Sequence, residues 1–141
     1  MNRGLRRTLL LDLNLFLGVT AVGGGVALLA GWIRVPLSSL AGSPFSDYTV
    51  PAVLLTVVVG GSALLAAGLV HLGTVAGLPA SAIAGGAIIV FEIVECSVIG
   101  FAWLQAAYLA IGVLIVSLAV WIQMAQVRGR VPRRLPPHAV H

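Results

Sequence analysis

Four long apolar stretches constrain the fold of this chain more than any other feature. They cover residues 9–33, 49–72, 79–101 and 104–127. A helix needs about 20 apolar residues to cross the ~30 Å hydrocarbon core of a bilayer, and each stretch reaches that length. Helices satisfy their own backbone hydrogen bonds in lipid. The sequence therefore predicts an all-α, polytopic membrane protein with four transmembrane helices in one antiparallel bundle within residues 1–127.

The composition excludes a soluble domain. Hydrophobic residues make up 60% of the chain and charged residues only 9%, whereas roughly a quarter of a soluble domain is charged. The formal net charge of +4 comes from eight arginines, since the chain contains no lysine. No groove of aromatic and basic residues accompanies them, so we expect no nucleic-acid partner.

The arginines predict the topology. Seven of them flank the first and the last apolar stretch: Arg3, Arg6, Arg7, Arg128, Arg130, Arg133 and Arg134. Because positive charge is retained on the cytoplasmic side, both ends should be cytoplasmic, which agrees with an even number of spans. Arg34 then lies in an outer loop. Residues 128–141 should form a basic, proline-rich cytoplasmic tail, and we expect the seven arginines to contact lipid headgroups of the bacterial plasma (inner) membrane.

Two acidic residues lie within the third apolar stretch. Glu92 and Glu95 are three residues apart, so they share one helix face. A charged side chain at the bilayer centre costs about 2.5–3.5 kcal/mol even on the more lenient scales. No basic residue lies at their depth, although Arg34 could reach inward from the outer side. At least one glutamate should therefore be protonated near neutral pH.

This acidic pair allows two interpretations. It could carry a proton, bind a cation, or act as general acid and base on an apolar substrate, because acids inside a membrane are commonly functional. It could instead be protonated and fix helix packing through hydrogen bonds to the neighbouring backbone or to Ser62, Ser81, Ser117 or Gln105. Both remain open at the level of sequence.

The remaining polar residues indicate no chemistry. Asp12 and Asn14 should lie close to the cytoplasmic interface, with Asp12 joining Arg6 and Arg7 in a charge cluster at headgroup level. Gln105 should be an ordinary interfacial residue. His138 and His141 lack partners at metal-ligand spacing. No nucleophile–base pattern or phosphate-binding loop occurs, so we predict no metal and no cofactor, and nothing in the sequence favours an enzyme.

Two short segments of the chain resemble parts of other membrane proteins. Residues 43–51, Ser-Pro-Phe-Ser-Asp-Tyr-Thr-Val-Pro, and residues 103–108, Trp-Leu-Gln-Ala-Ala-Tyr, resemble segments of small uncharacterised four-helix membrane proteins of bacteria. The resemblance implies the fold and the membrane location but no activity. Small multidrug-resistance transporters are similar in size and span number. They carry an essential glutamate in the first helix, where this chain has Asp12.

Three functions fit these features. A non-catalytic membrane subunit or interaction protein, with the bilayer and other membrane helices as partners, suits the glycine clusters at residues 23–25, 60–61 and 85–86. We expect these clusters to lie at similar depth and to meet. The alternative is an oligomeric proton- or cation-coupled carrier or channel that uses Glu92 and Glu95. The third is a membrane enzyme acting on a lipid or an isoprenoid.

Overall fold

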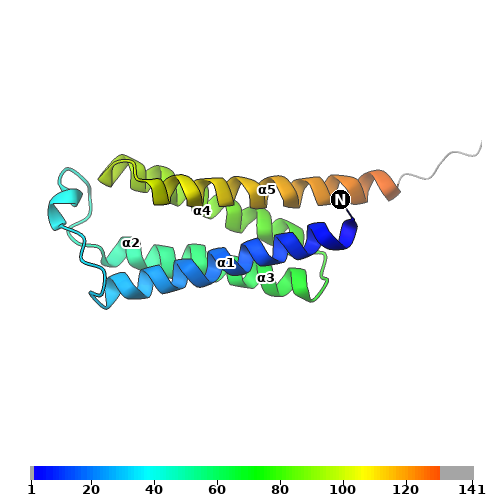
Figure 1. Ribbon diagram of the computed structural model, residues 1–141, viewed down its shortest axis with the longest axis horizontal. Helices are drawn as coiled ribbons and strands as arrows, with labels where there is room; N and C mark the ends of the chain where they lie inside the picture. The colour runs from blue at the N-terminus through cyan, green and yellow to red at the C-terminus, as the bar shows by residue number, and fades with distance from the viewer. Residues whose placement is uncertain (1, 131–141) are drawn as a thin grey trace, which may run out of the picture.

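The computed structural model of the chain describes residues 2–130, and regular secondary structure in that part is entirely helical (Figure 1). Four helices there are long and apolar enough to cross a membrane. They are formed by α1 (Arg3–Leu29), by α2 (Thr49–Val53) with η2 (Leu54–Gly60) and α3 (Gly61–His71), by α4 (Gly77–Ile99) and by α5 (Trp103–Arg130). The predicted all-helical chain with four such helices is thereby confirmed.

The first helix is displaced from its predicted position. α1 begins at Arg3 and ends at Leu29, whereas the apolar stretch covers residues 9–33. Arginine and leucine are good helix formers, so the helix continues through the polar start. Its end is set by Gly31, whose φ of 71° is the left-handed conformation that commonly terminates helices.

The last helix is longer than predicted. α5 continues through Arg130, so residues 128–130 are helical and do not belong to an extended tail. Arginine favours helix, and the first proline after the apolar stretch is Pro132. The rest of the predicted tail, including Arg133, Arg134, His138 and His141, lies outside the described residues.

The second long helix contains a π-helical segment. η2 joins α2 and α3 without a break, because the flanking residues Val53 and Gly61 keep helical backbone angles. Within it, the Thr56 hydroxyl donates to the Ala52 carbonyl oxygen at 2.8 Å, a side-chain bond that bends helices. π-Helical turns occur frequently at functional sites, and this one lines the apolar groove beside the acidic pair.

Glycines allow the helices to approach each other closely. A Cβ atom on Gly85 of α4 would lie 2.9 Å from the carbonyl oxygen of Gly112 on α5. One on Gly60 would lie 2.6 Å from the Val22 side chain of α1. Since no larger residue fits there, these backbones pack directly against their neighbours.

The predicted meeting of the glycine clusters holds for two of the three. Gly25 of α1 packs against Ala52 and Thr56, and Gly60 packs against Val22, so both lie between α1 and the second long helix. Gly85 packs against α5 instead, and a Cβ atom on Gly23 or Gly86 would meet no atom within 4 Å. Each cluster places one glycine against a neighbouring helix and another where no atom lies within 4 Å, because neighbouring residues on a helix point about 100° apart.

The bundle has two dissimilar ends (Figure 1). At one end lie the start of α1, the end of α5 and the link between α3 and α4. At the other lie the link between α4 and α5 and the long connection that contains η1 (Leu37–Leu40). The acidic pair and the arginine-rich segments belong to these different ends.

Candidate functional site

Glu92 lies on the buried face of α4. The buried residues Ser81, Ala84, Ile88 and Glu92 follow one another at spacings of three or four, which is the repeat of one helix face. Only 4% of the Glu92 surface is exposed. Glu95, one turn further along, is half-buried. The acidic pair therefore lies between the core and the surface of the bundle.

The two glutamates lie beside each other and beside a residue of α5. Glu95 lies within interaction range of the Glu92 and Gln105 side chains. The Gln105 Oε1 atom accepts a bond from the Ala102 backbone N–H at 2.6 Å, which leaves its amide N–H groups available to Glu95. Gln105 is only 5% exposed. The expectation of an ordinary interfacial residue is thus wrong, because the tight link between α4 and α5 turns this side chain inward.

No positive charge among the described side chains balances the pair. Within residues 2–129 no arginine or histidine nitrogen lies within 4.0 Å of a glutamate oxygen, so the exposed Arg34 does not act as its partner. The Glu92 Oε2 atom is buried and has no hydrogen-bond partner. Two carboxyl groups can bond to each other only through a shared proton or a bound cation. The arrangement is chemically suited to hold either one.

An apolar groove opens beside the pair. It has a volume of about 550 Å³ and runs between the second long helix and α4, with part of the connection over one end. Among the described residues, Glu95 is the only charged side chain in its lining. The other contributors include Leu54, Leu55 and Val58 of η2, Val90, Phe91 and Val94 of α4, and Leu40, Phe45 and Tyr48 of the connection. Glu95 thus belongs both to the groove and to the acidic pair.

A second buried polar contact joins α1 to α4. Asn14 is fully buried, and its amide nitrogen donates to the Leu10 carbonyl oxygen at 2.8 Å and to Ser81 Oγ at 3.1 Å. The Ser81 hydroxyl in turn donates to the Gly77 carbonyl oxygen at 2.8 Å. Sequence analysis placed Asn14 near the interface and missed this contact. Its spacing of four from Leu10 and three from Leu17, both buried, was the available signal.

The arginines near the start of α1 bind other helices. The Arg6 guanidinium lies 3.9 Å from the centre of the Trp121 ring on α5. Arg7 donates through Nε and Nη2 to the Val70 carbonyl oxygen of α3, at 3.2 and 3.1 Å. The predicted cluster with Asp12 is wrong, since Asp12 forms no ion pair within the described part of the chain. Asp12 follows these arginines by five and six residues, a spacing that does not bring side chains together on a helix.

The other predicted headgroup contacts remain predictions. Arg3 and Arg128 are exposed on α1 and α5. Arg130 ends α5, Arg133 and Arg134 lie beyond the described residues, and the structure describes no side chain for any of these three.

The described residues contain no group of three or more His, Cys, Asp or Glu side chains that could hold a metal ion. Comparison of the chain with protein-family models, with curated proteins and with solved structures finds no match. The function therefore has to be argued from the geometry of the chain itself.

Proposed function

We propose that this is a multi-pass membrane protein that binds an apolar, positively charged ligand in the groove between η2 and α4, in exchange for a proton held by Glu92 and Glu95. This is the proton- or cation-coupled alternative among the three functions that fit the sequence. The observation that supports it most is the position of Glu95, which lines the groove and lies beside Glu92 on the same helix face.

The chemistry of the groove favours a ligand of this class. Its wall is almost entirely apolar, so burial of an apolar body contributes most of the affinity. A single carboxylate in such a wall stabilises a positive charge strongly, because the surroundings screen it little. Glu95 can hold either the ligand's charge or the proton shared with Glu92, so that ligand and proton compete.

Catalysis on a lipid or isoprenoid is less well supported. An acid–base reaction needs a donor and an acceptor that both reach the substrate. Among the described residues of the groove, only Glu95 and Tyr48 carry a polar side chain, and the Tyr48 hydroxyl already donates to the Pro36 carbonyl oxygen at 3.1 Å. Glu92, the other acid, does not line the groove.

The role of a membrane subunit has one specific observation in its favour. Gly61 and Gly68 are exposed on α3, seven residues apart and hence on one face, and a side chain at either position would meet no atom of this chain. Such a face suits close contact with another membrane helix. An oligomer formed through α3 is compatible with the proposed binding site, because neither glycine lines the groove.

Filling the groove should abolish ligand binding. A side chain at Gly86 would meet no atom within 4 Å and would project into the groove, so Gly86→Leu should weaken binding of tetraphenylphosphonium about tenfold or more. Equilibrium dialysis of the detergent-solubilised protein measures this affinity.

Gly23→Leu is the matched control, since Gly23 is equally open but does not line the groove. Glu95→Gln removes the charge and leaves the shape, so it should weaken binding while the control does not. Equal binding by all four proteins would place the cation elsewhere and refute the proposal.

The proposed topology has four antiparallel spans in the plasma membrane, with both chain ends in the cytoplasm. It is supported by the arginines near the chain ends and by the separation of the connection from the start of α1 (Figure 1). In a Cys96→Ala background, a cysteine at Ser38 should react with an impermeant maleimide added outside cells. A cysteine at Asn2 should react only after permeabilisation. Labelling of both from the same side would show that the topology is wrong.

A further inference from the structure

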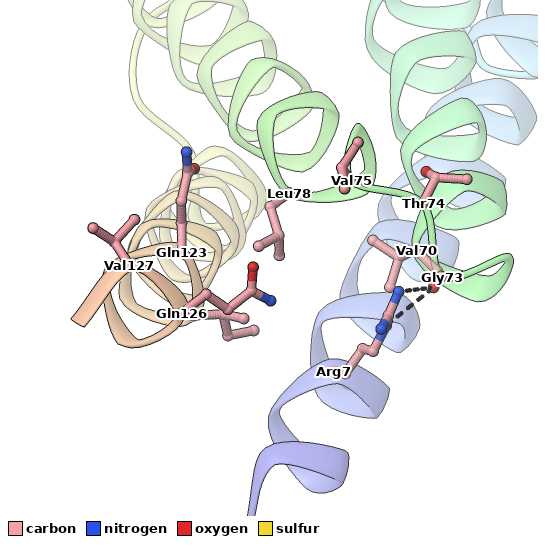
Figure 2. Close-up of a pocket in the computed structure, with 11 residues that line it drawn as sticks. Arg7, Val70, Gly73, Thr74, Val75, Leu78, Gln123, Gln126 and Val127 are labelled. Atoms are coloured by element: carbon pink, nitrogen blue, oxygen red, sulfur yellow. Dashed lines mark hydrogen bonds between the residues drawn. The ribbon is translucent and has the colours of Figure 1, made fainter. Parts of the chain in front are cut away.

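A cavity of about 410 Å³, lined by both polar and apolar side chains, lies at the end of the bundle opposite the acidic pair. Arg7 of α1 forms one wall, the link before α4 forms a second, and α5 contributes Gln123 and Gln126. In Figure 2 the Gln126 side chain extends from α5 into the space between that helix and Arg7. Apolar side chains, among them Leu78, complete the lining.

The Arg7 guanidinium is held in place and still has free donors. Its Nε and Nη2 atoms donate to the Val70 carbonyl oxygen (Figure 2, dashed lines). An arginine carries five N–H donors, and two of them bond to Val70. The remaining three have no acceptor among the described residues. The amides of Gln123 and Gln126 likewise make no hydrogen bond to the described residues. The cavity therefore presents several unused donors around one fixed positive charge.

No carboxylate side chain of the described residues lines this cavity. Asp12, Asp47, Glu92 and Glu95 are the acidic residues of the chain, and none lines it. A fixed guanidinium with neighbouring amide donors matches the oxygens of a phosphate group, which arginine binds through several parallel hydrogen bonds.

We propose that the cavity binds the phosphate headgroup of an anionic lipid, with Arg7 as the main contact and Gln126 as a second donor. The inference rests on the proposed placement of the four helices in a membrane but not on the groove or the acidic pair. That placement puts this end of the bundle at the cytoplasmic headgroup level, where basic pockets between helices recognise anionic lipids. The apolar part of the lining then contacts the beginning of the acyl chains.

Native mass spectrometry of the purified chain in detergent can count bound lipids. We expect one molecule of palmitoyl-oleoyl phosphatidylglycerol to bind more tightly than the matching phosphatidylcholine. Arg7→Gln should weaken this binding about fivefold, the usual contribution of one basic residue at an anionic surface. Arg3→Gln is the control, because it removes the same charge from the same end but lies outside the cavity.

Three further outcomes are decisive. If Arg3→Gln and Arg7→Gln weaken binding equally, general attraction explains it and the site is refuted. If inorganic phosphate displaces the lipid at equal concentration, a soluble phosphate is the better occupant and the lipid assignment is wrong. If the Arg7→Gln variant does not fold, the Gln126→Leu variant takes its place, because it leaves the Arg7–Val70 bonds intact. Gln126→Leu should then bind the lipid less tightly than Arg3→Gln does. Equal binding by Gln126→Leu and Arg3→Gln would refute the inference.

Discussion

Gly85→Leu should separate α4 from α5 and destabilise the bundle by about 3 kcal/mol, the upper part of the range for overpacked cores. A Cβ atom at this position would lie 2.9 Å from the Gly112 carbonyl oxygen and 2.8 Å from the Val116 side chain. Backbone atoms of a neighbouring helix cannot move aside as a side-chain tip can. The two helices must therefore shift apart along their whole contact, which includes the place where Glu95 lies beside Gln105.

Gly23→Leu is the matched control, because Gly23 is also a helical glycine but has no neighbour within 4 Å. Unfolding by sodium dodecyl sulfate, followed by circular dichroism in mixed micelles, measures both free energies. The control should stay within about 0.5 kcal/mol of wild type, as surface substitutions usually do. Equal stability of Gly85→Leu and the control would show that α4 and α5 do not pack through this glycine.

The sequence was sufficient to predict the four long helices, because hydropathy over some 20 residues depends little on tertiary contacts. It was less informative about where they start. α1 begins at Arg3, so Asn14 lies about three turns into the helix and inside the core. Counting from the first apolar residue had placed Asn14 near the interface. Helix propensity continues through polar residues that hydropathy leaves out.

The candidate site was predictable only in part. Glu92 and Glu95 were evident as acids within an apolar stretch. Gln105 was one of several candidate neighbours, although the short link between α4 and α5 offered a guide, since residues close to a tight helical hairpin link lie near one another. The groove, and the bonds from Arg7 to Val70, depend on how separate helices pack, and local sequence patterns do not determine that.

Replacing both glutamates by glutamine should abolish proton exchange and leave the fold intact. Glutamine keeps the volume of glutamate and can hydrogen-bond to its neighbours, but it does not ionise. Glu92→Leu/Glu95→Leu should instead cost about 1–3 kcal/mol, because the buried Gln105 amide would lose its partner. If the pair only fixes packing, the glutamine variant should retain every activity of wild type, and only the leucine variant should differ.

Competition between ligand and proton also predicts a pH dependence. The deprotonated pair is the form that binds a cation, so affinity for tetraphenylphosphonium should rise as the pH rises. By reciprocity, the cation must release protons when it binds. The Gln/Gln variant should show a weak affinity that does not change with pH.

Proton release on ligand binding tests the central claim most directly. Tetraphenylphosphonium is added to detergent-solubilised protein in a weakly buffered solution with a pH indicator, and bound cation is measured in parallel. At a pH where the pair still holds its proton, the wild-type protein should release about one proton per bound cation, and Glu92→Gln/Glu95→Gln should release none. Binding by the wild-type protein without proton release at any pH, or equal release by the double variant, would contradict the account.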